Sequence, residues 1–104
     1  MEIYGVLLKD FTFKNGESPE TFIEYIHENE LNLPGQTTAG KDACQENPYF
    51  GIRASFTKSE CEFETIEEVK KFIIKTLNPF IDITENNEQE IRRNISTYTI
   101  YTED

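Results

Sequence analysis

The sequence predicts a single α+β domain spanning residues 1–104, a two-layer sandwich in which an antiparallel sheet packs against helices on one face. Three observations predict this class. Short alternating apolar runs indicate strands, two segments with apolar residues three and four positions apart indicate amphipathic helices, and the two kinds of segment follow one another along the chain. Because 104 residues is the length of one ordinary domain, these elements are expected to share one core.

The first predicted strand covers residues 2–8 and is apolar on both faces. One face would carry its odd-numbered apolar residues and the other its even-numbered ones, namely Ile3 and Leu7 against Tyr4, Val6 and Leu8. A strand that is apolar on both sides is covered on both sides, so we expect it at the centre of the sheet.

A helix is predicted to begin after Ser18 and to fade between Asn29 and Asn32. Ser18 is a favourable N-cap residue, and Pro19 fits the first helical position, where its missing N–H costs nothing. The apolar face of this helix consists of Phe22, Ile23 and Ile26. This spacing predicts a helix that lies on the sheet.

Residues 34–48 are predicted to form a long polar loop, which in a small domain is usually functional or mobile. Residues 35–41 fit the G-x-x-x-x-G-K pattern of a phosphate-binding loop. We reject that motif because Asp42 stands where the motif needs Ser or Thr, and because Pro48 follows too soon for a helix.

A β-hairpin is predicted over residues 49–64. Its first strand, residues 49–56, would turn alternate side chains toward the core: Phe50, Ile52, Ala54 and Phe56. Residues 57–59 would form the turn. The return strand, residues 60–64, would place Cys61 and Phe63 on one face and three acidic residues on the other: Glu60, Glu62 and Glu64.

A second helix is predicted from Thr65 to about Leu77, because Thr65 and Glu68 have the spacing of a capping box. Beyond the helix, residues 80–83 are a short strand candidate, and residues 85–94 are a polar connection, with one helical turn as the alternative. Residues 95–102 are rich in β-branched and aromatic side chains and are predicted to be the last strand.

The predicted element order is therefore β-α-β-β-α-β-β. Its first six elements match the split βαβ, or ferredoxin-like, arrangement, an antiparallel sheet with both helices on one face and an open second face. We therefore expect four to five strands and two helices. Such an arrangement also has its first strand at the centre, but the fold does not determine the function.

Net charge restricts the partners. The chain carries 20 acidic and 10 basic residues, a formal net charge of -10. Direct binding to nucleic acid or to an anionic membrane is disfavoured, because both need a positive surface. A basic protein partner is favoured, because opposite fields steer encounter. The sequence has no apolar run of about 20 residues and its start does not resemble a signal peptide, so a cytoplasmic location is expected.

Ten of the 20 acidic residues fall in two stretches without Lys or Arg, residues 17–30 and 60–68. In the first stretch, Glu20, Glu24 and Glu28 stack on one helix face at four-residue spacing. Each such like-charged pair destabilises a helix by about 0.2–0.5 kcal/mol. We interpret the stripe as a surface for a basic partner. The alternative is an ordinary solvated face.

The second stretch would project Glu60, Glu62 and Glu64 from one side of a strand, about 6–7 Å apart. This is close to the spacing of phosphates along one nucleic-acid strand, so it suggests mimicry of a nucleic-acid backbone. The alternative is an edge strand that its charges protect against aggregation. Mimicry needs both acidic stretches on one surface.

Candidate catalytic and metal-binding groups are few. The chain has two cysteines, Cys44 and Cys61, one histidine, His27, and no C-x-x-C motif. A structural zinc site needs four closely spaced Cys or His ligands, so no metal or other cofactor is predicted. The two cysteines are expected to be reduced thiols, with a disulfide between them left open.

These observations predict a small acidic inhibitor that occupies the nucleic-acid-binding surface of a basic protein, as phage anti-defence and nuclease-immunity proteins do. The predicted contacts are Glu20, Glu24, Glu28, Glu60, Glu62 and Glu64. An alternative is a regulatory or structural subunit that binds through the open sheet face or a sheet edge, with Tyr98 or Tyr101 as anchor. A third hypothesis, a small enzyme or ligand-binding domain, would gain from a pocket that unites His27, Cys44 or Arg53.

Overall fold

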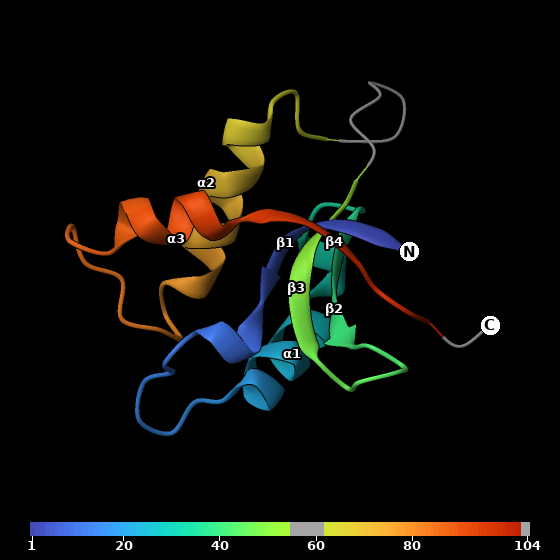
Figure 1. The fold of residues 1–104 in the computed structure, drawn as a ribbon, viewed down its shortest axis with the longest axis horizontal. Helices are drawn as coiled ribbons and strands as arrows, with labels where there is room; N and C mark the ends of the chain where they lie inside the picture. Colours follow the sequence, from blue (N-terminus) through green and yellow to red (C-terminus); the bar gives the residue numbers. More distant parts are fainter. Residues whose placement is uncertain (55–61, 103–104) are drawn as a thin grey trace.

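A computed structural model describes residues 1–54 and 62–102 of the chain. Within these residues, the protein is an α+β structure with one four-stranded antiparallel sheet and three α-helices (Figure 1). The elements in chain order are β1 Glu2–Leu7, α1 Pro19–Glu28, β2 Thr37–Lys41, β3 Pro48–Arg53, α2 Ile66–Leu77, α3 Glu88–Asn94 and β4 Ser96–Thr99. Two 3₁₀ turns, Leu8–Asp10 and Glu30–Asn32, follow β1 and α1.

The strand order in the sheet is β2-β3-β1-β4. Strand β1 pairs with β3 on one side and with β4 on the other, and all pairs are antiparallel. The prediction that the first strand is central is confirmed, and its two-sided apolar pattern reflects cover on both faces. The edges of the sheet are β2 and β4.

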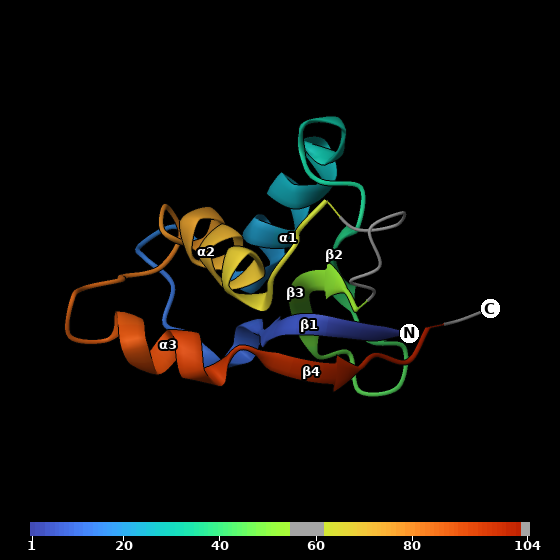
Figure 2. The same ribbon diagram turned by 90° about the horizontal axis from the view of Figure 1, so that it is seen from above.

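Helices α1 and α2 lie on the same face of the sheet, whereas α3 lies near the level of the sheet, just before β4 (Figure 2). The core between the helices and the sheet is dense in aromatic rings. Phe22 of α1 meets Phe50 of β3 edge to face at 4.9 Å between ring centroids, and Phe80 at 5.0 Å on another side. Ile73 of α2 is fully buried in the same core.

Both long helices begin at capping boxes. Ser18 accepts a hydrogen bond from the Thr21 N–H, and Thr21 Oγ1 accepts one from the Ser18 N–H. Thr65 and Glu68 exchange the same pair of bonds at the start of α2. These bonds satisfy backbone donors that have no partner within the helix, so both predicted helix starts are confirmed.

Two glycines let β1 and β3 approach closely. Gly5 and Gly51 are cross-strand partners. A Cβ atom on Gly51 would lie 2.7 Å from the Tyr4 carbonyl oxygen, and one on Gly5 would collide with the Phe50 carbonyl. Because the obstacles are backbone atoms, they cannot rotate away, and this crossing accepts glycine only.

The second sheet face is partly covered, which corrects the prediction that it is open. Ile3, Tyr49 and Ile100 bury one another there, and Leu7 and Tyr98 pack against them. The residues after β4 continue across this face, where the Ala43 N–H donates to the Tyr101 carbonyl at 2.8 Å. Tyr101 itself is 56% exposed.

The predicted hairpin is wrong in position. The segment predicted as a polar loop, residues 34–48, contains β2, and β2 forms the hairpin with β3. β2 was missed because only Ala39 of its five residues is buried, so it has no apolar alternation. Of the predicted return strand, residues 62–64 are irregular; Glu60, Cys61 and the predicted turn lie outside the described residues.

Two further expectations need correction. The described residues contain three helices instead of two, because the polar connection after residue 85 includes α3. The predicted strand at residues 80–83 is reduced to a single bridge between Ile81 and Phe13. The last strand is shorter than predicted, since β4 ends at Thr99.

Candidate functional site

The predicted acidic face exists on α1. Phe22 and Ile26 point into the core, and Glu20, Glu24 and Glu28 are exposed on the outer side of the same helix. The helix therefore uses one side for packing and presents the other, with three glutamates, to solvent.

Glu20 differs from the other two glutamates because it has a cationic partner. Lys41 Nζ at the end of β2 lies 3.3 Å from Glu20 Oε1. The pKa of the Glu20 carboxyl is lowered, chiefly by a hydrogen bond to its own backbone N–H in the first helical turn and next by Lys41. Among the described residues, neither Glu24 nor Glu28 takes part in an ion pair.

The second predicted acidic set does not form a regular row. Glu60 lies outside the described residues. Glu62 accepts a hydrogen bond from the Gly35 N–H at 3.2 Å, and Glu64 precedes α2, where its own N–H donates to the Glu68 carboxylate at 2.7 Å. Because residues 62–64 are not a strand, they lack the regular spacing that phosphate mimicry needs.

Within the described residues, Glu62 is the member of the second acidic set that comes near the segment after α1. Its carboxylate reaches Gly35, in the loop that follows α1 and the 30–32 turn. Glu64 lies instead at the N-terminal end of α2. The structure thus groups Glu20, Glu24 and Glu28 on one helix, brings Glu62 to the loop beyond that helix, and leaves Glu64 apart.

Basic residues are concentrated elsewhere. Helices α2 and α3 carry five of the ten: Lys70, Lys71, Lys75, Arg92 and Arg93. Glu67 on α2 pairs with two of them, at 2.6 Å from Arg92 and 3.9 Å from Lys70. The outer surfaces of α2 and α3 are therefore mixed in charge, whereas that of α1 is acidic.

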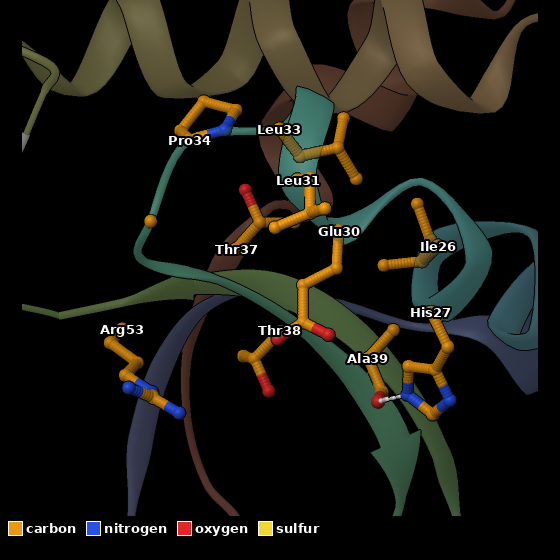
Figure 3. A pocket seen from close by; sticks show the side chains of 11 residues that line it. Ile26, His27, Glu30, Leu31, Leu33, Pro34, Thr37, Thr38, Ala39 and Arg53 are labelled. Atoms are coloured by element: carbon orange, nitrogen blue, oxygen red, sulfur yellow. Dashed lines mark hydrogen bonds between the residues drawn. The ribbon is translucent and has the colours of Figure 1, made fainter.

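A pocket of about 620 Å³ lies beside the C-terminal end of α1 (Figure 3). Its walls come from the end of α1, the following turn and loop, the edge strand β2, and Arg53 at the end of β3. The sequence did not predict it, because β2 was expected to be loop. However, the pocket includes both His27 and Arg53, two of the three residues named for the ligand-binding hypothesis.

Polar groups line this pocket in a definite arrangement. His27 Nε2 lies 2.8 Å from the Ala39 carbonyl oxygen, which fixes the ring against the edge of β2. Glu30 and Arg53 reach into the pocket from opposite sides in Figure 3, with Thr38 drawn between them. The hydroxyl of Thr37, a lining residue, is buried and has no hydrogen-bond partner within the described structure.

Apolar side chains form another part of the wall. Leu33 and Pro34 are half-buried, whereas Leu31 is 99% exposed. Cys44, the third residue of the ligand-binding hypothesis, is an exposed free cysteine in the β2–β3 turn and does not line the pocket.

Among residues 1–54 and 62–102, no group of three His, Cys, Asp or Glu side chains is placed to hold a metal ion. No helix in this part of the chain is long and apolar enough to span a bilayer. In comparisons with known proteins, no family model, curated protein or solved structure matches the chain.

Proposed function

We propose that the protein binds a basic surface of another protein through the outer face of α1 and thereby blocks nucleic acid from that surface. The observation that carries the proposal is the exposed glutamate stripe, in which Glu24 and Glu28 have no ion-pair partner among the described residues. No Lys or Arg occurs between Asn15 and Gly40. This role is one of binding and not of catalysis.

The cost of the stripe supports a functional role. Glu24 has a like charge four residues away on each side, and each such pair disfavours the helix by about 0.2–0.5 kcal/mol. Glu28 also lies at the C-terminal end of α1, where the helix dipole disfavours negative charge. A basic partner would turn both unfavourable interactions into attraction.

The contacts are ranked by how free each carboxylate is. Glu24 and Glu28 come first, and Glu20 follows because it already has Lys41. Glu62 borders the same end of α1 through Gly35 and would extend the surface. Glu60 and Glu64 belong to the proposed contact set on their charge and spacing in the sequence.

We also propose that the fold is ferredoxin-like with α3 added before the last strand, and that the protein acts in the cytoplasm. The strand order β2-β3-β1-β4 and the two helices on one sheet face support the fold proposal. The fold leaves the outer face of α1 away from the sheet, so a partner can approach it without disturbing the core.

The test is capture of a partner with charge-reversed variants. Immobilised wild type is expected to retain a basic protein from host lysate, and Glu24→Lys with Glu28→Lys is expected to lose it. The matched control reverses Glu85 and Glu90, two exposed residues near α3, and changes net charge equally. This control should retain the partner.

The captured protein must then pass two further measurements. Binding should weaken as salt rises, because exposed charges act through screened fields. Added nucleic acid should release the captured partner from the immobilised protein, because both would bind the same basic surface of the partner. Capture that is indifferent to salt, or equal loss in both double variants, would rule out the α1 face.

The second candidate is a regulatory or structural subunit that binds through the second sheet face. The exposed ring of Tyr101 favours it, whereas burial of Ile3, Tyr49 and Ile100 leaves less of that face available. This candidate predicts that Tyr98→Ala or Tyr101→Ala weakens capture more than the Glu24 and Glu28 reversals do.

A further inference from the structure

The pocket at the end of α1 is not used by the proposed contact surface. At about 620 Å³ it has the size of pockets that hold small ligands. It lies along β2, an edge strand, and is closed on the other side by the turn and loop after α1. Its lining combines separated charges, hydroxyls and aliphatic side chains, and this combination indicates which class of ligand would fit.

The two charges are the most specific feature. Glu30 and Arg53 line the same pocket, and no ion pair joins them within the described part of the chain. A purely anionic ligand would gain from Arg53 but would meet Glu30. A purely cationic ligand would meet the reverse conflict. A ligand that carries both charges satisfies both side chains.

The buried hydroxyl of Thr37 is the second feature. Buried polar groups in folded proteins nearly always have a hydrogen-bond partner, so an unpartnered one calls for an explanation. Thr37 Oγ1 has none within the described residues, and Thr37 lines the pocket. Because this hydroxyl is closed off from solvent, a polar ligand group reaches it only after a local movement of the side chains around it.

The aliphatic wall is the third feature. Leu31 is 99% exposed, so folding of this chain buries almost none of its apolar surface. Leu33 and Pro34 continue the wall with partly exposed surface. An aliphatic group of a ligand would remove this surface from water, at about 25 cal/mol for each Å² of apolar area buried.

We propose that this pocket binds a zwitterion with an aliphatic side chain, either a free amino acid or a short peptide. The ligand carboxylate pairs with Arg53, the ammonium group pairs with Glu30, and the side chain covers Leu31. His27, held against the Ala39 carbonyl, forms part of the wall. Glu24 and Glu28 do not line the pocket, and Glu62 borders it through its hydrogen bond with Gly35, so the ligand site adjoins the proposed contact surface without sharing its glutamates.

The probe is L-leucine. Its binding to the full chain is measured by isothermal titration calorimetry and by changes in amide chemical shifts in heteronuclear NMR. N-acetyl-L-leucine lacks the ammonium group, and L-leucinamide lacks the carboxylate. Each is expected to bind at least about tenfold more weakly than L-leucine, because each loses a charged hydrogen bond. L-leucylglycine separates the two sources: tighter binding than that of L-leucine indicates a short peptide, and weaker binding indicates a free amino acid.

The variants are Glu30→Gln and Arg53→Gln, with Glu90→Gln and Arg93→Gln as matched controls outside the pocket. All four positions are exposed, so none should unfold the chain. Each pocket variant should weaken L-leucine binding by about tenfold, and the controls should leave it unchanged. The shifted amides should belong to β2 and residues 30–35.

Three results would overturn the site. The first is no heat and no amide shift with L-leucine or L-leucylglycine at millimolar concentration. The second is equal binding of L-leucinamide or N-acetyl-L-leucine, which would show that one charge suffices. The third is an affinity for L-leucine that both pocket variants retain.

Discussion

Helices α1 and α2 have the same structural role, but their outer surfaces differ in charge. Each begins at a capping box, and each buries an apolar face against the same side of the sheet. On the outside, α1 carries glutamates without Lys or Arg, whereas α2 mixes Glu67 with Lys70 and Lys71 and ties Glu67 to Arg92 of α3. Packing therefore does not dictate surface charge, and the helix whose outer face is less favourable for stability is the better candidate for binding.

The largest expected effect tests whether the inner faces are equivalent. Phe22→Ala on α1 should lower the free energy of unfolding by about 3–5 kcal/mol, and Ile73→Ala on α2 by about 2–5 kcal/mol, because both leave cavities. Urea denaturation measures both. As a control, Leu31→Ala at an exposed position should change the free energy of unfolding by less than about 0.5 kcal/mol.

Where an alanine variant does not fold, Ile73→Val keeps the test available, with an expected loss of about 0.5–1.5 kcal/mol. A loss near zero for Phe22→Ala would mean that α1 is not part of the core, and the comparison would fail at its first step.

Removal of each N-cap should have a smaller effect of equal size on the two helices. Ser18→Ala and Thr65→Ala should each destabilise the protein by about 1 kcal/mol, because each leaves a backbone donor without its side-chain acceptor. Thermal unfolding followed by circular dichroism measures the change. The exposed Thr12→Ala serves as control. A clear effect at only one cap would show that the two helices depend differently on their first turns.

Neutralising one outer glutamate should give opposite signs on the two helices. Glu24→Gln removes two like-charged pairs and should stabilise the protein by about 0.2–0.5 kcal/mol per pair. Glu67→Gln removes exposed pairs with Arg92 and Lys70 and should destabilise it by about 0.2–1 kcal/mol. Both changes should shrink when urea denaturation is repeated at high salt. The same sign for both would remove the contrast.

The smallest effect concerns Glu20, the α1 glutamate that has a cation beside it. Its pKa is lowered by its own backbone N–H and by Lys41. Its contribution to stability is therefore present above the unfolded pKa and is lost as pH falls through the folded pKa. Lys41→Met should move the pKa of Glu20 part of the way back toward its ordinary value.

Carboxyl NMR titration measures this shift, and Lys71→Met, on the other helix, should leave the Glu20 titration unchanged. A Glu20 pKa that does not respond to Lys41→Met would mean that the hydrogen bonds with its own backbone N–H and with Ser18 lower it without Lys41.

Local signals predicted α1, α2 and the central strand well. Ser18 and Thr65 mark the helix starts because capping needs a particular side chain next to the first turn. The central place of β1 could be predicted because both of its faces are apolar. The edge strand β2 could not be found in this way. It has small, polar residues and buries only Ala39, so its pairing is decided by β3 and not by its own pattern.

The candidate site divides in the same manner. The glutamate stripe could be predicted because helical spacing fixes which residues share a face. The pocket could not, since Glu30, Thr37 and Arg53 come from three separate segments that meet only once β2 pairs with β3. The row predicted for Glu60, Glu62 and Glu64 is not seen in the part of it that the structure describes. Residues 62–64 are irregular there, so period-two alternation of charge does not by itself make a strand.

The contact between Gly5 and Gly51 has a consequence for how relatives of this chain can be identified. Surface glutamates and loop residues can drift, whereas the backbone atoms that face these two positions exclude every side chain. A chain with this strand crossing should therefore keep glycine at both positions while the rest of its sequence diverges. One glycine in the first strand and one in the third, each between apolar residues, would be the marker by which to search for distant homologues.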